Sequence, residues 1–391
     1  MTRQQSFDRI VLMANDVDRL GGVGRFINEM ALGFHSRGYE TELVGVSPPP
    51  AGHRQVVQRP AEIVVRTLMP ESPPEDWVLR SDADKRDKAR VARHERRFEL
   101  REIAVAQLRE LIEFWGPRTL IICTQVYGME HMLEAGYDAD DSSHPRVIGQ
   151  YHGSFTGAQN TGNDLRRVLK AYDTVDRSVF LTAAYAEEFR KKGLNNTYWV
   201  PNPVATPAHT EKERSNTFVA LGRYDEEKSL HYLLAAWNEV SEQLPDWRVE
   251  LYGEGPLRPQ LQSMIDDRSI PRAQLMGKTD QVGEVLIGSK VHVLTSQVEG
   301  LPIAIVEAGL LGVPTVAFDC SPGIRELIDS ERTGLVVPKN NVRELSEAML
   351  SLAEDHETLS SMSEACAAES KRYAPGKILD QWEDLFFQMS R

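Results

Sequence analysis

The chain has 391 residues and a formal net charge of −13, with 41% hydrophobic residues. At roughly 150 residues per domain this length predicts two domains, and the acidic balance argues against a broad nucleic-acid-binding surface. The three cysteines form no CxxC pair and have no metal-ligand spacing with histidine, so we expect a reducing, cytoplasmic location without a disulfide framework. No stretch approaches the ~18 uncharged apolar residues of a membrane helix, so we expect membrane contact to be at most peripheral.

Short β-branched runs alternate with helical patterns through the first half of the chain. Such runs occupy residues 9–14, 41–46, 119–124, 146–151 and 178–182. After the first run comes a glycine-rich loop, and then a segment with apolar residues on one helical face that ends at Gly38. This alternation is typical of a parallel sheet with helices on both faces, an α/β fold.

One segment, residues 75–115, departs from this pattern. It is highly charged and lacks glycine and proline, and Val91, Phe98, Val105 and Ile112 recur every seven residues. We expect a long helix or a helical hairpin whose polar end protrudes. The simplest interpretation is an exposed charged arm. An oligomerisation arm or a membrane-surface arm is the alternative, because basic residues gather in its first half.

The stretch "WVPNPV" at residues 199–204 separates two similar halves, because its two prolines resist helix and sheet. The same alternation restarts after it, with runs such as "TFVALG", "KVHVLTS" and "TGLVVP". The sequence therefore predicts an N-terminal domain over residues 1–203, with an insertion at about 75–115, and a second α/β domain over residues 204–375. A last helix over residues 376–391 has two alternative packing sites, one on each domain, and we expect it to pack back on the N-terminal domain.

Two patterns at the ends of N-terminal strands suggest ligand contact. Gly22 and Gly24 begin a G-x-G-x-x-G fingerprint, but Ile27 occupies its third glycine position, so a dinucleotide site is weakly supported and a simple tight turn stays open. His152 follows an apolar strand in "GQYHG", where parallel sheets bind ligands. A structural role for a lone histidine is the alternative.

The second domain contains a candidate phosphate site in "GRYDEEK". Arg223 and Lys228 follow a strand and precede a helix with an apolar face. Arginine offers a fork of donors and lysine a point charge, and both suit a phosphate. Two surface charges on a loop are the alternative interpretation.

The stretch "EGLPIAIVE" contains two glutamates eight residues apart. Glu299 stands just before the expected helix, and the N–H groups around Gly300, Leu301 and Pro302 form a potential anion site at its start. Glu307 lies within the helix among apolar residues, where an ionised carboxylate is costly without partners. It either faces the surface or accepts hydrogen bonds from a polyol such as ribose.

Several other chemistries lack support in the sequence. There is no G-x-S-x-G elbow, and "GKT" at residues 277–279 lacks the first glycine of a P-loop, because Arg272 stands there. Three D-x-D patterns begin at residues 16, 82 and 138, and we expect turns and solvated charge at all three rather than a metal site. The glycines of "YGEGP" allow a close backbone approach, to a ligand or to a neighbouring strand.

These motifs together resemble the retaining GT-B glycosyltransferases of family four, also called group 1. The resemblance rests on "EGLPIAIVE", "GRYDEEK", "YGEGP", the "GGVGR" loop and the stretch "SPGIRELIDSERTGLVVP" at 321–338. It spans nearly the whole chain except the charged arm and the "GYDADDSSHP" loop. It implies two Rossmann-like domains that face each other across a cleft, with the nucleotide sugar bound by the second domain.

The resemblance also implies roles for individual residues of the second domain. Arg223 and Lys228 would neutralise the diphosphate leaving group, and Glu307 would bind the ribose hydroxyls. Glu299 would lie beside the donor sugar, with the backbone of residues 300–302 near sugar and phosphate.

On the N-terminal side, the resemblance places Gly22 along the diphosphate and His152 opposite the donor sugar. It implies no metal and no cofactor, and a UDP-sugar as the donor. The expected activity is transfer of a hexose or N-acetylhexosamine to an acceptor: a cell-envelope polymer, a lipid-linked acceptor or a protein. A GT-B sugar-nucleotide epimerase or hydrolase is the alternative enzyme. A catalytically idle binding protein that assembles through its charged arm is the alternative outside enzymes.

Overall fold

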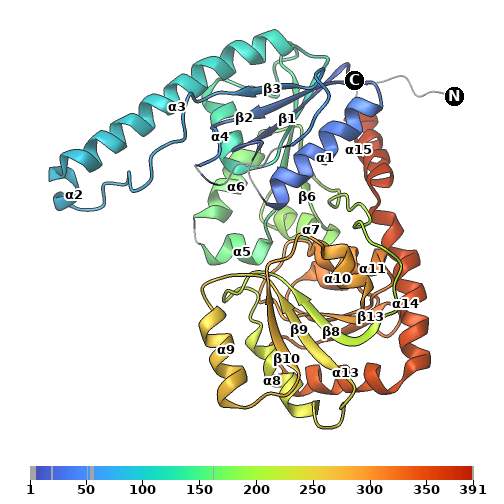
Figure 1. Ribbon diagram of the computed structural model, residues 1–391. Helices are drawn as coiled ribbons and strands as arrows, with labels where there is room; N and C mark the ends of the chain where they lie inside the picture. The colour runs from blue at the N-terminus through green and yellow to red at the C-terminus, as the bar shows by residue number, and fades with distance from the viewer. Residues whose placement is uncertain (1–5, 19–20, 51, 53–56, 162, 390–391) are drawn as a thin grey trace. The chain divides into compact units, whose positions relative to one another are not determined.

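The computed structural model describes residues 6–18, 21–50, 52, 57–161 and 163–389. Expectations for the first five residues, and for Arg19 and Leu20 in the first glycine loop, lie outside these residues. The chain divides into two compact units (Figure 1). Unit 1 comprises Met1–His152, Ala158–Pro203 and Ile378–Arg391, and unit 2 comprises Gly153–Gly157 and Val204–Lys377.

Unit 1 is built on a seven-stranded sheet with the order β3-β2-β1-β4-β5-β6-β7, parallel throughout. Its strands are β1 (Arg9–Ala14), β2 (Glu40–Gly45), β3 (Val64–Thr67), β4 (Thr119–Cys123), β5 (Arg146–Tyr151), β6 (Arg177–Phe180) and β7 (Thr197–Trp199). Five of these match predicted runs. The short edge strands β3 and β7 were not predicted, because a strand of three or four residues that is exposed, as every residue of β3 is, shows little apolar patterning.

The C-terminal helix packs on unit 1, against α1. The helices wholly within this unit are α1 (Gly22–Ser36), α2 (Asp82–Arg86), α3 (Lys88–Trp115), α4 (Val126–Glu134), α6 (Asp164–Tyr172) and α7 (Ala183–Lys191). Two more, α5 (Phe155–Asn160) and α15 (Pro375–Met389), begin with residues of unit 2 and continue in unit 1. A Cβ atom on Gly33 would lie 2.6 Å from Cδ1 of Leu379, so glycine is what lets α1 and α15 approach closely. The rings of Phe34 and Phe386 lie beside this contact, tilted by 37° with 5.5 Å between their centroids. Of the two arrangements considered for the last helix, the structure has the one on the first unit.

The charged segment forms one long helix, α3, which extends away from the sheet with α2 at its far end (Figure 1). The seven-residue stripe predicted as its apolar face is wrong: Phe98 is 48% exposed, and only Ile112 of that stripe is fully buried. The residues that α3 buries are Leu100, Ala104, Leu108, Ile112 and Trp115. Their spacing is mostly four residues, as on a straight helix of 3.6 residues per turn that packs on its own sheet rather than in a coiled coil.

The preceding segment of the same chain runs back along the outer part of α3. Trp77 stacks on His94 at 5.8 Å, and the guanidinium of Arg97 lies 4.3 Å from the Trp77 ring. This contact covers part of the arm from within the same chain, by a non-helical segment rather than by the second helix of a hairpin.

The acidic pairs prove to be structural. Ser81 and Asp84 form a capping box at α2, and the backbone N–H of Asp140 donates to Asp138 in a loop. The expectation of solvated charge is wrong for the first pair, because Asp16 is buried and Asp18 forms a 2.6 Å ion pair with Arg59.

Unit 2 has a six-stranded parallel sheet with the order β10-β9-β8-β11-β12-β13. Its strands are β8 (Ser215–Leu221), β9 (Arg248–Tyr252), β10 (Ala273–Gly277), β11 (Ser289–Leu294), β12 (Thr315–Phe318) and β13 (Gly334–Val337). Its helices are α8 (His231–Val240), α9 (Arg258–Asp267), α10 (Val282–Ile287), α11 (Ile303–Leu310), α12 (Pro322–Leu327), α13 (Val342–Glu354) and α14 (His356–Ser370), followed by the 3₁₀ turn η1 (Lys371–Tyr373).

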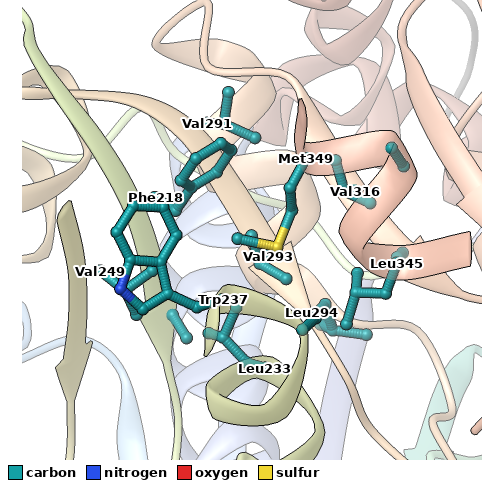
Figure 2. Packing of buried hydrophobic residues seen from close by; sticks show 14 of the residues in the cluster. Phe218, Leu233, Trp237, Val249, Val291, Val293, Leu294, Val316, Leu345 and Met349 are labelled. Atoms are coloured by element: carbon teal, nitrogen blue, oxygen red, sulfur yellow. The ribbon is translucent and has the colours of Figure 1, made fainter. Parts of the chain in front are cut away.

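The main core of unit 2 lies between this sheet and the helices α8 and α13. Figure 2 shows Trp237 of α8 and Met349 of α13 packed against strand residues such as Phe218 and Val293. Both units are therefore Rossmann-like α/β domains, as predicted. None of the described helices is long and apolar enough to span a bilayer.

A buried histidine on β11 makes the stability of unit 2 depend on pH. Nδ1 of His292 lies 3.1 Å from Thr315 Oγ1, and burial, followed by the charge of Lys228, lowers the pKa of His292 to about 4. In an unfolded chain the pKa of histidine is about 6.5. Between these values the unfolded chain binds a proton that the folded chain does not, so the free energy of unfolding falls as the pH falls through this window.

We expect wild-type stability to fall by about 2 kcal/mol more between pH 7 and pH 5 than that of His292→Asn. Urea unfolding at the two pH values measures the difference. His356→Asn, at an exposed histidine at the start of α14, is the control and should behave like the wild type. An identical pH dependence in His292→Asn and wild type would contradict the expectation.

Candidate functional site

In both sheets the second and third strands are added outward on one side of the first strand, and the next strand lies on the other side of it. In unit 2 this change of side falls between β8 and β11, and in unit 1 it falls between β1 and β4. Parallel α/β sheets bind ligands outside the carboxyl ends of the strands at such a switch point. The motifs selected from the sequence of unit 2 follow β8 and β11 directly.

In unit 2 the structure brings Lys228 and Glu299 together. Nζ of Lys228 donates to Oε1 of Glu299 at 2.6 Å, and Oγ of Ser296 donates to the same oxygen at 2.6 Å. Only 11% of the Glu299 side chain and 24% of the Lys228 side chain are exposed, so the pair is largely shielded from water. A half-buried ammonium group and a carboxylate therefore stand at the switch point.

Two hydrogen bonds to backbone carbonyl groups join the loop after β11 to the loop after β8. Oγ1 of Thr295 donates to the carbonyl of Lys228 at 3.0 Å, and the N–H of Gln297 donates to the carbonyl of Glu227 at 2.7 Å. The sequence did not predict that Thr295 would bind the other loop in this way, or that Ser296 would hold Glu299. The loops after β8 and β11 therefore form one preorganised surface.

Arg223 belongs to the same loop but points into solvent. Its side chain is 73% exposed and forms a 2.8 Å ion pair with Asp225, whose Oδ1 accepts from the N–H of Lys228. The predicted pair of cations thus consists of one shielded and one exposed group. The exposed guanidinium is free to turn toward a bound anion with little cost in packing.

The glycines of "YGEGP" fit the backbone of the loop after β8. A Cβ atom on Gly253, where φ is 150°, would lie 1.8 Å from the carbonyl oxygen of Gly222. One on Gly255, where φ is 159°, would lie 2.4 Å from the carbonyl oxygen of Tyr224. Of the two readings of these glycines, the structure supports close packing on the neighbouring loop, which fixes the backbone next to Arg223.

The second glutamate, Glu307, is buried within α11 and is 7% exposed. The surface-facing alternative is therefore wrong. Gly300 and Leu301 lie on the loop that enters this helix, and Pro302 is its N-cap residue, without a side-chain cap. The helix begins at Ile303, two residues later than expected, because the extended ψ of 97° at Pro302 delays it.

In unit 1, Gly22 and His152 lie at the same edge of the sheet. Gly22 opens α1 after β1, with Gly21 as N-cap at a φ of 141° that favours glycine. His152 follows β5 directly, and its ring packs edge-on against Phe26 in the first turns of α1, with 4.7 Å between ring centroids. Burial lowers the pKa of His152 to about 3, so the ring is neutral at neutral pH.

The described residues contain no group of three or more histidine, cysteine, aspartate or glutamate side chains placed to hold a metal ion. The three cysteines are free and buried. The groups that the structure places around the strand ends of unit 2 are two cations, a carboxylate and the backbone N–H groups before α11.

Comparison with protein families matches residues 204–368 to the family described as "Glycosyl transferases group 1". An uncharacterised glycosyltransferase of Haemophilus influenzae is 29% identical over 232 residues, which are 58% of this chain and 66% of that protein. The poly(ribitol-phosphate) alpha-N-acetylglucosaminyltransferase of Staphylococcus aureus is 29% identical over 142 residues, 36% of this chain and 29% of that protein. The chain thus spans less than two thirds of either curated relative.

Among solved structures, HepE of Anabaena in complex with UDP and glucose superposes with a TM-score of 0.72. The superposition covers 97% of this chain and 100% of HepE at 15% sequence identity. At this identity the likeness establishes the fold alone, which is the GT-B fold of two Rossmann-like domains.

Proposed function

We propose that the chain is a group 1 glycosyltransferase, the family that its residues 204–368 match, and that it moves a hexose or N-acetylhexosamine from a nucleoside-diphosphate sugar to an acceptor. The observation that carries this proposal is the contact between Lys228 and Glu299 at the switch point of unit 2, inside the matched region. We favour UDP as the nucleotide. The UDP bound to HepE supports this choice, and so does the family that the motifs resemble, which implies a UDP-sugar donor.

The proposed chemistry is cleavage of the anomeric C–O bond with departure of a nucleoside diphosphate. Negative charge grows on the leaving phosphate, so fixed cations and N–H groups stabilise the transition state. Lys228 can donate to Glu299 and to a phosphate oxygen at the same time, because an ammonium group has three donors. Arg223 turns from Asp225 to the phosphate, and the N–H groups of Gly300 and Leu301 stand at the entrance of α11.

The remaining roles follow the resemblance. Glu299 lies beside the donor sugar, and the buried carboxylate of Glu307 accepts from the ribose hydroxyls. Gly22 leaves room for the diphosphate, and His152 takes part as a neutral imidazole that donates or accepts a hydrogen bond. Retention of configuration, by front-face attack or a short-lived ion pair, also rests on the resemblance.

The acceptor we favour is a cell-envelope polymer. The relative in Staphylococcus aureus is named for a poly(ribitol-phosphate) acceptor and an N-acetylglucosamine donor, which supports this class. Lipid-linked and protein acceptors are the other candidates. The relatives named above are transferases and give no support to an epimerase or a hydrolase.

The experiment that tests the proposal is a donor panel with purified full-length chain. Release of nucleoside diphosphate is measured from UDP-, GDP- and ADP-linked glucose and N-acetylglucosamine, with and without poly(ribitol phosphate), and with EDTA. We expect slow hydrolysis of a UDP-sugar, faster release with acceptor, and unchanged rates in EDTA. An epimerised nucleotide sugar without release would refute transfer, and a loss of activity in EDTA that manganese restores would refute the metal-free chemistry.

Removing either cation should weaken transition-state stabilisation. We expect Arg223→Ala and Lys228→Ala each to lower kcat/KM by roughly 30-fold to 1000-fold, which corresponds to a loss of transition-state stabilisation on the order of 2–4 kcal/mol. Arg343→Ala, at a fully solvated arginine of α13, is the control and should leave kcat/KM unchanged. Because the Arg223 side chain is 73% exposed, its loss should not alter the unfolding midpoint. Wild-type kinetics in both variants would rule out the phosphate role.

We further propose that the arm formed by α2 and the outer part of α3 serves acceptor placement or assembly, including peripheral contact with a membrane, rather than donor cleavage. Leu100 is the first buried residue of α3, so replacing Asp76–Glu99 by a short linker stops where the core begins. Donor hydrolysis should survive this deletion, while transfer to the acceptor or the mass by light scattering should change. Hydrolysis lost from a chain that still unfolds cooperatively would refute this division of labour.

A further inference from the structure

Gln150 is a buried amide that the fold of unit 1 leaves unsatisfied. It lies on β5 with 0% exposure, and neither its Oε1 nor its Nε2 has a hydrogen-bond partner among the described residues. Its backbone is satisfied, because Tyr172 Oη donates to the Gln150 carbonyl at 2.9 Å. An unsatisfied buried polar group costs roughly 1–3 kcal/mol, and such groups are rare in folded proteins. Methionine would fill the same space without this cost, so the amide calls for an explanation.

Gln150 and His152 lie on the same side of the sheet. Ile148 belongs to the core that α1 and α15 cover, and side chains alternate along a strand, so Gln150 faces that core too. Phe26 belongs to the same core and holds the His152 ring at 4.7 Å. The two polar residues are therefore successive side chains on the face covered by α1.

The ring of His152 is also incompletely satisfied. Its Nε2 is buried without a hydrogen-bond partner among the described residues. The contact with Phe26, at an interplanar angle of 65°, fixes the plane of the ring but does not decide which nitrogen carries the proton. Since burial keeps the ring neutral, one nitrogen is a donor and the other an acceptor, and a hydrogen bond to one of them sets the tautomer.

We propose that Gln150 is a positioning residue that binds a buried water molecule together with Nε2 of His152 and thereby sets the tautomer and orientation of that ring. Side chains two positions apart on a strand lie about 6.6 Å apart, and two hydrogen bonds through one water span about 5.6 Å. The amide oxygen can accept one hydrogen of this water, so that the other hydrogen is donated to Nε2 and the ring carries its own proton on Nδ1. Trp382 Nε1, buried and unpartnered in the same core, is available as a further donor.

The first test reads the ring itself, without any assay of activity. Full-length chain labelled with ¹⁵N-histidine is compared as wild type, Gln150→Met and Ile148→Met by NMR, and His152→Phe identifies the His152 signals by their loss. Gln150→Met keeps length and removes the hydrogen-bonding atoms. Ile148→Met is the matched control, since it repacks the same face of the same strand. We expect the two ring nitrogen shifts of His152 to move toward the other tautomer in Gln150→Met alone, while those of the buried His292 in unit 2 stay unchanged.

The second test measures transfer, and it rests on the proposed function. In Gln150→Met we expect kcat to fall on the order of tenfold, with the KM for the donor within about twofold of wild type and the unfolding midpoint unchanged or higher. Transfer by Ile148→Met should match the wild type.

The outcomes separate this proposal from the function it rests on. Unchanged His152 signals in Gln150→Met, or equal movement in Ile148→Met, would overturn the proposal whatever happens to activity. Moved signals with unchanged kcat would support the link between Gln150 and His152 and count against a role of His152 in transfer.

Discussion

The ion pair between Lys228 and Glu299 is the constraint on which the candidate site of unit 2 depends. The two residues come from loops after neighbouring strands, and their contact at 2.6 Å closes the surface between those loops. Both side chains are partly withdrawn from water, so each stabilises a charge that would otherwise be costly at that depth. A donor phosphate that binds here meets an ammonium group already held in place, and little reorganisation is needed as charge develops.

The surrounding structure protects this geometry at the level of the backbone. Gly253 and Gly255 allow the loop after β9 to press against the carbonyls of Gly222 and Tyr224, where any side chain would collide. Thr295 and Gln297 tie the other side of the same loop to the end of β11. The loop after β8 is thus held from two neighbouring strands, whereas the Arg223 side chain at its edge stays solvated. Of the two cations, Lys228 is therefore held in place by its surroundings, and Arg223 is exposed to solvent.

Local patterns in the sequence predicted much of this arrangement. The runs at Arg9–Ala14 and Arg146–Tyr151 coincide with β1 and β5, because strands buried on both faces are continuous apolar segments. The end of each apolar run also marked where the polar motifs "GRYDEEK" and "EGLPIAIVE" follow a strand. The contact of Lys228 with Glu299 was not predictable from spacing, since it depends on β8 and β11 being neighbours. The apolar stripe of α3 was misjudged, because a seven-residue repeat and a 3.6-residue repeat diverge over a helix of 28 residues.

The path of the chain through unit 1 has a consequence for its biosynthesis. The helix α15 buries Trp382 and Phe386 in the core under α1, yet these residues are synthesised later than all of Val204–Lys377. All of Val204–Lys377 is translated between the two parts of that core, which takes on the order of ten seconds or longer at roughly 5–20 residues per second. During this interval the α1 side of the nascent sheet lacks its cover, while unit 2 already has its main segment in full. The later-synthesised domain is therefore the first that can close its core, and the N-terminal domain completes its core only once α15 has been made.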